Sequence, residues 1–292
     1  MLQDLDFGRL ENEFYNDVAP RDEDIVVCFR GGDILTLRDE AVRLPEFRQV
    51  AAWAADWKHW EETQCRYLFS LQGKRYYLWM GEAGACPHPE GIYESARYLR
   101  KTAPKSICYP AMTAWHLFTW YRNNRFCGRC GERTRHDEKE RMVYCPKCGN
   151  LIFPRISAAV IIAVTDGDRI LLTKYAHRNQ ANYALVAGYT EIGENLEQTV
   201  HREVMEEVGL RVKNIRYYKS QPWGVDGTVL MGFFCDLDGD DTIRLDEHEL
   251  ALAQWHHRHA MPIHDDGYSL TREMMGVFEK GREPLAKGRD LL

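Results

Sequence analysis

The chain has 292 residues, long enough for more than one domain, and its 45% hydrophobic and 12% aromatic content can fill a buried core. Its 44 acidic and 38 basic side chains give a net charge of −6, which argues against a general polyanion binder and restricts any nucleic-acid contact to a local patch. The opening MLQDLDFGRLENEF lacks the basic start and apolar core of a signal peptide. The longest stretch without Asp, Glu, Lys or Arg, 106–121, falls short of a membrane span. We therefore expect a cytoplasmic protein with no membrane partner.

The first third of the chain is predicted to be rich in β-strands. The strand-like segments IVVCF and ILTL flank a glycine-containing turn at 30–33, and CRYLFSL and RYYLWM flank another at 72–74. Both patterns indicate hairpins in which glycine supplies the positive φ of the turn. Apolar residues at helical spacing predict helices over 47–60 and 111–123. No catalytic constellation stands out in the resulting N-terminal domain, 1–122, whose role the sequence leaves open.

Five of the nine cysteines are scattered among apolar or aromatic neighbours. Isolated cysteines of this kind usually serve as small core residues. We therefore interpret five cysteines as structural or incidental, namely Cys28, Cys65, Cys86, Cys108 and Cys235.

The other four cysteines have the spacing of a zinc ribbon. Cys127 and Cys130 form one CxxC pair, and fourteen residues later Cys145 and Cys148 form another, each pair being followed by glycine. Four thiolates without a histidine or an open position predict a structural zinc site. The alternative is a pair of disulfides or a redox pair, which a cytoplasmic location disfavours. The ribbon, 123–152, is too short to bury a core, so metal binding is expected to supply its folding energy.

The remaining residues, 153–292, predict a mixed α/β module. ISAAVIIAV and RILLTKYA indicate two strands around the turn TDGD, and ALVAGYT indicates a strand that leads through a loop into a helix. KNIRYYKSQPW and TVLMGFFCDLDG are two further strands. HELALAQWHH is expected to begin a short terminal unit, which ends in a helix over 269–280.

The helix of this module carries three carboxylates on one face. Glu203, Glu206 and Glu207 lie beside an apolar stripe of valines four residues apart, at 200, 204 and 208. A solvated surface helix could tolerate such like-charge pairs, because each costs only ~0.2–0.5 kcal/mol. Carboxylates on a rigid helix are also the hard ligands that Mg²⁺ or Mn²⁺ prefers beside a phosphate. Gly209 is expected to end the helix in the left-handed conformation.

The wider pattern decides between these interpretations. From Gly188 the sequence reads G-x5-E-x7-R-E-V-x-E-E-x-G-L, with Glu194 and Arg202 as its other fixed polar residues. This array resembles the Nudix box, the signature of enzymes that hydrolyse a nucleoside diphosphate linked to another group. The resemblance implies an α/β (α+β) fold with a mixed sheet between helices, joined here to the ribbon and the β-rich N-terminal domain. It also implies that Arg202 orients a carboxylate by ion pairing.

Three further features narrow the resemblance. A four-cysteine ribbon directly precedes the module, SQPW follows the box at 220–223, and a lone glutamate stands in HELALAQW at 249. Together they resemble the NADH pyrophosphatases, or NAD⁺ diphosphatases, whose bacterial members remove NAD caps from RNA. The resemblance extends from Phe126 to about Trp255 and is weak over the first hundred residues.

The resemblance implies a set of site residues. Glu203, Glu206, Glu207, Glu249 and the backbone carbonyl of Ala187 would hold Mg²⁺ or Mn²⁺. Phe153 and Tyr189 would sandwich the nicotinamide from two subunits, which implies a homodimer. The rest of the dinucleotide site would be lined by Gln221, Pro222, Trp223, Gly224, Val225, Asp226, Gly227 and Thr228, with Thr271 at its edge.

The implied reaction is metal-dependent hydrolysis of the diphosphate of NADH or NAD⁺ to nicotinamide mononucleotide and AMP, and removal of NAD caps from RNA. The catalytic residues would be Glu203, Glu206 and Glu207, with Glu207 as the general base or its metal anchor. One departure concerns the run after SQPW, where the family has Pro-Phe-Pro and this chain has Gly224-Val225-Asp226-Gly227. It leaves open the ranking of NADH, NAD⁺ and capped RNA.

Two other functions remain open. The first is a zinc-ribbon nucleic-acid binder whose Nudix module only senses a nucleotide, because residues 122–147 carry eight basic against four acidic side chains. The second is a Nudix hydrolase of another nucleotide, such as ADP-ribose.

Overall fold

The computed structural model describes residues 1–6, 8–15, 18–53, 65–80, 91–176, 182–262 and 266–285. Their contacts divide the chain into two compact units, which we call the Nudix unit and the N-terminal unit. The Nudix unit consists of Met1–Leu2, Ile156–Pro222 and Thr228–Leu292, and the N-terminal unit consists of Gln3–Arg155 and Trp223–Gly227.

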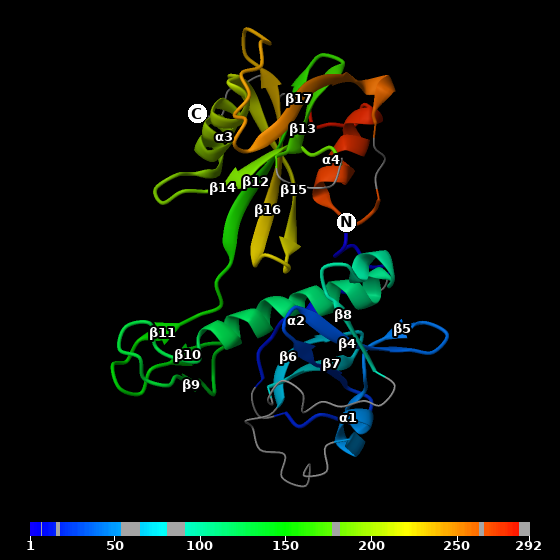
Figure 1. Cartoon of the computed structure of the whole chain (residues 1–292), viewed down its shortest axis with the longest axis vertical. Helices are drawn as coiled ribbons and strands as arrows, with labels where there is room; N and C mark the ends of the chain where they lie inside the picture. Colours follow the sequence, from blue (N-terminus) through cyan, green and yellow to red (C-terminus); the bar gives the residue numbers. More distant parts are fainter. Residues whose placement is uncertain are drawn as a thin grey trace. The chain divides into compact units, whose positions relative to one another are not determined.

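The N-terminal unit contains two small sheets and a ribbon (Figure 1). One sheet has the strand order β1-β6-β7-β2, and the other joins β3, β4, β5 and β8. The bounds are β1 Leu10–Glu11, β2 Ile25–Val27, β3 Phe29–Arg30, β4 Asp33–Arg38, β5 Val42–Arg43, β6 Cys65–Leu71, β7 Lys74–Trp79 and β8 Ile92–Ser95.

Both predicted hairpins are present. β3 pairs antiparallel with β4, and β6 with β7, around turns in which Gly31 and Gly73 have φ of 61° and 74°. The segment IVVCF, however, is not one strand. It divides at Cys28, so that β2 joins β7 in the first sheet while β3 joins β4 in the second. Pattern alone does not reveal this change of partner.

The two helices predicted for the N-terminal unit are both present. Helix α1 covers Phe47–Trp53, and the rest of the predicted run to residue 60 lies outside the described residues. Helix α2 covers Lys105–Asn123, preceded by the short 3-10 helix η1 at Leu99–Lys101. It begins earlier than predicted, because the chain is already helical before Pro110 and continues through it. Pro110 is buried, although proline lacks the backbone N–H that an interior helical residue normally donates.

The zinc ribbon completes this unit with three short strands in the order β11-β10-β9. They are β9 Arg135–His136, β10 Val143–Tyr144 and β11 Leu151–Ile152. Elsewhere in the chain, Cys28, Cys65, Cys108 and Cys235 are buried as predicted, and Cys86 lies outside the described residues.

The Nudix unit is built on a six-stranded mixed sheet, in the order β15-β16-β12-β13-β17 with β14 also on β12. Its strands are β12 Ser157–Asp166, β13 Arg169–Tyr175, β14 Val186–Tyr189, β15 Val212–Trp223, β16 Thr228–Leu237 and β17 Leu250–His257. β12 pairs antiparallel with β13 and β14 but parallel with β16. The HELALAQWHH prediction was wrong in one respect, because β17 is an integral strand on β13 rather than the start of a terminal unit.

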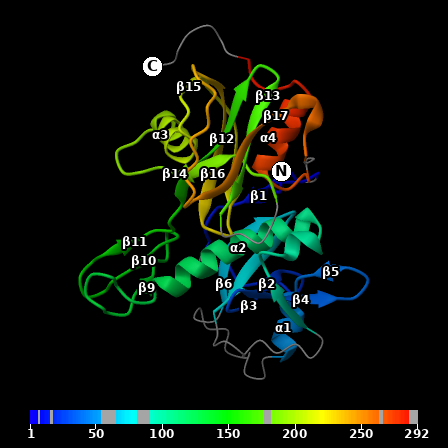
Figure 2. The same cartoon turned by 45° about the horizontal axis from the view of Figure 1, so that its top comes forward.

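Helices cover both faces of this sheet, as Figures 1 and 2 show. They are α3 at Leu196–Val208 and α4 at Leu270–Glu279, with a 3-10 turn η2 at Arg258–Ala260. Alternate residues of β12 divide between them: Val160, Ile162 and Val164 pack on the α3 side, and Ile161 and Ala163 on the α4 side. This confirms the predicted mixed sheet between helices. Among the described helices, none combines the length and apolar surface that crossing a bilayer requires.

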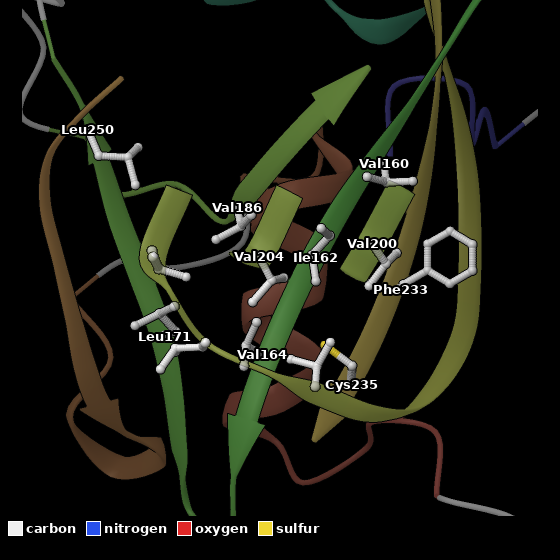
Figure 3. Packing of buried hydrophobic residues seen from close by; sticks show 13 residues of the cluster. Val160, Ile162, Val164, Leu171, Val186, Val200, Val204, Phe233, Cys235 and Leu250 are labelled. Carbon is white, nitrogen blue, oxygen red and sulfur yellow. The ribbon is translucent and has the colours of Figure 1, made fainter. Parts of the chain in front are cut away.

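The valine stripe of α3 fixes that helix to the sheet. Val200, Val204 and Val208 are fully buried, and Figure 3 shows Val200 and Val204 directed at β12 and its neighbours. Burying each such side chain contributes roughly 1.5–3 kcal/mol. The stripe therefore determines where the glutamates of the same helix lie.

Candidate active site and metal centre

The acidic helix α3 has well-formed ends. Asn195 and Gln198 form a capping box, in which each side chain accepts a hydrogen bond from the other's backbone N–H, at 2.8 and 2.9 Å. At the other end Gly209 has a φ of 69°, and its N–H donates to the carbonyl of Met205, as the sequence predicted. The helix is therefore held at both ends without help from a ligand.

The three box glutamates lie in different environments. Glu203 and Glu207, four residues apart beside the valine stripe, are only 8% and 2% exposed. Glu206 points to solvent, with 58% of its side chain exposed. The helix therefore presents two buried carboxylates and one accessible carboxylate.

Arg202 holds the loop and the helix together. Its guanidinium donates to both carboxylate oxygens of Glu194 (2.6 and 2.9 Å), to Glu203 (2.7 Å) and to Glu206 (2.9 Å). It also donates to the carbonyl oxygen of Tyr189 at 2.9 Å. The predicted ion pairing of Arg202 is confirmed, and it extends over more partners than the sequence indicated. Its effect is to fix the orientation of Glu203 and Glu206.

Glu194 is the anchor of this arrangement. Arg202, followed by the N–H of Glu191, lowers the pKa of Glu194 to about 2. The carboxylate also accepts a hydrogen bond from the Thr199 hydroxyl at 3.1 Å. Glu194 therefore stays ionised over the whole physiological range and serves to hold the loop.

Glu207 differs from every other carboxylate of the box. Among the described residues, no group donates a hydrogen bond of normal geometry to either of its buried oxygens, although the backbone N–H of Ala187 is close enough to act against the rise of its pKa. Burial, followed by the negative charges of Glu203 and Glu249, raises the pKa of Glu207 to about 8. A buried carboxylate without a partner carries a large desolvation cost, which a bound cation would offset. The side chain therefore fits a divalent metal.

Gly188 is required by the position of Glu203. A Cβ on Gly188 would lie 2.0 Å from the carboxylate carbon of Glu203, closer than any real contact. The residue sits in β14 opposite Val160, next to Ala187, and has no positive φ. The glycine is therefore explained by the close approach of a carboxylate to the strand and not by a turn.

Glu249 stands in the turn before β17 and is exposed. Its negative charge raises the pKa of both Glu203 and Glu207, so it contributes to the same negative field. Among the described residues, the four ribbon cysteines form the group of metal-binding side chains whose ligand atoms all lie within 4.8 Å of one another. The glutamates are not drawn together to that degree.

The ribbon cysteines fit zinc. The sulfurs of Cys127 and Cys148 are 3.6 Å apart, and those of Cys130 and Cys145 are 3.4 Å apart. A tetrahedral ion with bonds of ~2.3 Å calls for sulfurs separated by about 3.8 Å. The backbone N–H of Arg129 is the main cause that lowers the pKa of Cys127 to about 6, which favours the thiolate a metal requires.

The predicted nicotinamide residues lie in different units. Tyr189 is 53% exposed in the Nudix unit, and its hydroxyl lies 3.2 Å from that of the buried Thr228. Phe153 is 52% exposed and belongs to the N-terminal unit. Pro222 is exposed, and Thr271 is partly buried on α4.

Gln221 is fully buried, and its amide is used inside the Nudix unit. Its Nε2 donates to the carbonyl of Tyr268, and its Oε1 accepts from the N–H of Leu270, both at 2.8 Å. The side chain thus ties β15 to the start of α4.

The segment 223–227 packs within the N-terminal unit. A Cβ on Gly224 would lie 2.2 Å from the carbonyl oxygen of Met112, and the indole N–H of Trp115 donates to the carbonyl of Val225 at 3.3 Å.

The second half of the segment contacts the same unit. Asp226 forms an ion pair with Arg97 at 2.9 Å. Gly227 has a φ of 68° beside the ring of His116, and Arg100 lies over the ring of Trp223. Helix α2 therefore accounts for both glycines of this segment.

Comparison with known families agrees with this fold and site. The NUDIX domain model matches residues 154–275, and the NADH pyrophosphatase zinc ribbon domain model matches residues 122–153. The chain belongs to the Nudix hydrolases that carry this zinc ribbon.

Its curated relatives include several proteins named NAD-capped RNA hydrolase NudC. That of Erwinia tasmaniensis is 35% identical over 217 residues, which cover 71% of this chain and 80% of the relative. The protein of Photorhabdus laumondii is 35% identical over 159 residues, which cover 54% of this chain and 62% of the relative. The protein of Mannheimia succiniciproducens is 41% identical over 145 residues, which cover 47% of this chain and 53% of the relative. The chain thus spans less than two thirds of the latter two relatives.

Proposed function

We propose that this protein hydrolyses the diphosphate bond of NADH and NAD⁺ to nicotinamide mononucleotide and AMP, and that it removes NAD caps from the 5′ ends of RNA. Support comes from the Nudix and zinc ribbon matches and from relatives named for NAD-capped RNA hydrolysis. The observation that carries the proposal is Glu207 near the C-terminal end of the acidic helix, a buried carboxylate for which the described residues provide no hydrogen bond of normal geometry.

The proposed metal ligands are Glu203, Glu206, Glu207, Glu249 and the carbonyl of Ala187. Their hard oxygens suit Mg²⁺ or Mn²⁺, which when bound would acidify water and neutralise charge on the phosphoryl oxygens. The protein's own contribution is orientation: Arg202 fixes Glu203 and Glu206, and the capped helix and its valine stripe fix Glu207. Glu207 would hold the proton taken from water, or a metal in place of that proton.

We propose that the nicotinamide stacks on Tyr189, whose ring is exposed and whose hydroxyl contacts Thr228. Phe153 would come from the second subunit of a homodimer in the cytoplasm, as the family resemblance implies. In functional terms we divide the chain into an N-terminal domain (1–122), the ribbon (123–152) and a catalytic domain (153–292). The ribbon would hold one zinc per subunit.

The proposal is tested by assaying NADH, NAD⁺, ADP-ribose and NAD-capped RNA side by side with Mg²⁺ and Mn²⁺ and separating the products. We expect AMP and a nicotinamide mononucleotide from the dinucleotides and 5′-monophosphate RNA from the capped strand. Faster cleavage of ADP-ribose than of any nicotinamide substrate would assign another substrate. If none of the four is cleaved, the protein is a nucleotide sensor rather than an enzyme.

A further inference from the structure

The N-terminal unit contains a pocket of about 690 Å³ that the proposed hydrolysis does not use. It lies among the N-terminal strands, the C-terminal end of α2 and the first part of the ribbon, with lining residues that include Phe29, Arg66, Tyr121 and His136. Its volume is within the ~300–1,000 Å³ typical of small-molecule sites. None of its lining residues belongs to the acidic helix.

The lining is strongly basic. It includes Arg66, Arg122, Arg125 and Arg133 but no Asp or Glu. Within the described part of the chain, the last three of these arginines form no ion pair. Glu132, the nearest acid in sequence, accepts the backbone N–H of Arg133 at 3.1 Å. Guanidinium groups without carboxylate partners are suited to a phosphate, which they bind through paired N–H donors.

The charge inside the pocket does not come from His136. Burial, followed by the positive charge of Arg66, lowers the pKa of His136 to about 4, so the ring is neutral at pH 7. It lies against Tyr121, with ring centroids 5.1 Å apart. A neutral imidazole offers one donor and one acceptor nitrogen, which suits the edge of a nucleobase.

Aromatic rings form much of the remaining lining. Trp79 and Tyr121 are at most 7% exposed, and Phe29 stacks on Phe118 with ring centroids 4.8 Å apart. Arg122 lies over the Phe118 ring at 5.3 Å. Planar heteroaromatic groups gain from stacking on such rings, and a stacked base brings its phosphate toward nearby arginines.

We propose that this pocket binds a nucleoside 5′-phosphate, with the base against the aromatic rings and the phosphate on the arginines. The nucleotide is either free or part of an RNA strand, since both offer the same chemistry. The pocket is the local basic patch that a net-acidic chain needs for such a ligand. The assignment goes beyond the proposed hydrolysis and does not depend on it.

The test uses the full zinc-loaded chain in buffer without Mg²⁺ or Mn²⁺, and calorimetry with AMP, adenosine and 5′-phosphorylated penta-adenylate as probes. The pocket variant is R125Q/R133Q. The matched control is R129Q/R135Q, which removes two exposed arginines of the same ribbon that do not line the pocket. We expect the pocket variant to weaken binding of a phosphorylated probe at least tenfold and the control to change it less than twofold, with adenosine binding weakly throughout.

Ultraviolet cross-linking of the bound probe, mapped by mass spectrometry, adds a second readout, expected on peptides that contain Trp79 or Tyr121. If the pocket variant binds both phosphorylated probes more weakly, the result supports a site for the nucleotide itself. Weaker binding of penta-adenylate alone assigns the site to RNA, and weaker binding of AMP alone assigns it to a free nucleotide. Equal binding by the two double variants, or cross-links confined to the Nudix unit, overturns the proposal.

Zinc content and a melting curve show whether the pocket variant is folded. If it is not, R122Q on α2 becomes the deciding variant, with the same expected loss and the same overturning result. NADH hydrolysis should stay at the wild-type rate in all these variants. A failure of the pocket proposal is therefore distinguishable from a failure of the proposed hydrolysis, which appears in the wild type.

Discussion

The zinc ribbon and the acidic helix α3 both collect anionic side chains, but they hold them in different ways. Within the ribbon, residues 123–152, only Cys127, Val143 and Cys145 are buried. Helix α3 instead packs its valines into a cluster of thirteen buried residues contributed largely by the sheet. The ribbon must therefore obtain its order from metal binding, whereas the helix is placed by a hydrophobic core.

This comparison separates stability from activity. Removing a ligand from the ribbon should unfold it, because its three short strands and three buried residues are too few to hold the thiolates together without the metal. Removing a ligand from the helix should leave the fold intact and affect the chemistry. The following variants test that division, from the largest expected effect to the smallest.

The largest effect is expected for Cys145→Ser. The serine cannot replace a thiolate, and structural zinc in isolated fingers contributes about 10–16 kcal/mol to folding. We expect the variant to lose its zinc and the ribbon to unfold, at a cost of several kcal/mol. Metal analysis and calorimetry measure both. Lys147→Ser, an exposed neighbour in the same knuckle, is the control and should keep both zinc and stability. A Cys145→Ser protein that melts like the wild type would rule out the ribbon's dependence on metal.

Next comes Glu207→Gln, which keeps the shape of the side chain but removes its charge. We expect the rate of NADH hydrolysis to fall at least a hundredfold, ~3 kcal/mol in the barrier, while the melting temperature does not decrease. Glu197→Gln, in the exposed first turn of the same helix, is the control and should remain near the wild-type rate. Retention of more than about a tenth of the wild-type rate by Glu207→Gln would remove Glu207 from the mechanism.

The structural framework of these two sites could be predicted from the sequence because each framework is a local pattern. The CxxC pairs, the left-handed Gly209 and the valine stripe all follow from the spacing of nearby residues, and the structure confirms each of them as a structural feature. The same is true of the two hairpins with Gly31 and Gly73.

Contacts between distant parts of the chain were not predictable in this way. The parallel pairing of β12 with β16, the change of sheet at Cys28 and the place of β17 in the main sheet all depend on partners far away in sequence. The buried amide of Gln221 could not be inferred either, because its partners, Tyr268 and Leu270, lie beyond the recognised motifs.

A smaller effect concerns pH, in protein without Mg²⁺ or Mn²⁺. Folding raises the pKa of Glu207 from 4.5 to about 8, so between these values the folded chain keeps a proton that the unfolded chain has released. The stability contributed by this group is therefore complete below pH 4.5 and is lost as the pH rises toward 8. Glu207→Gln lacks this dependence. Its free energy of unfolding relative to that of the wild type should therefore increase by on the order of 2 kcal/mol between about pH 6 and 8.

Denaturant unfolding at several pH values measures that difference, with Glu197→Gln expected to follow the wild type throughout. Parallel stability curves for Glu207→Gln and the wild type would show that burial does not hold a proton on Glu207. Added Mg²⁺ should narrow the difference in stability, because a cation bound to the carboxylate replaces the proton.

The smallest effect is expected for Gly188→Ala, which tests whether the core alone positions the carboxylates. The new Cβ would lie 2.0 Å from the carboxylate carbon of Glu203, so that side chain must move while the strand stays paired with β12. A displaced ligand should lower kcat about tenfold, ~1.4 kcal/mol, with a smaller change in KM. The combination with Glu203→Asp distinguishes this cause from a general disturbance, because the shorter side chain draws the carboxylate away from the new methyl group. We therefore expect the double variant to lose less activity than the product of the two single losses, whereas strictly multiplicative losses would show that Gly188 does not act through Glu203.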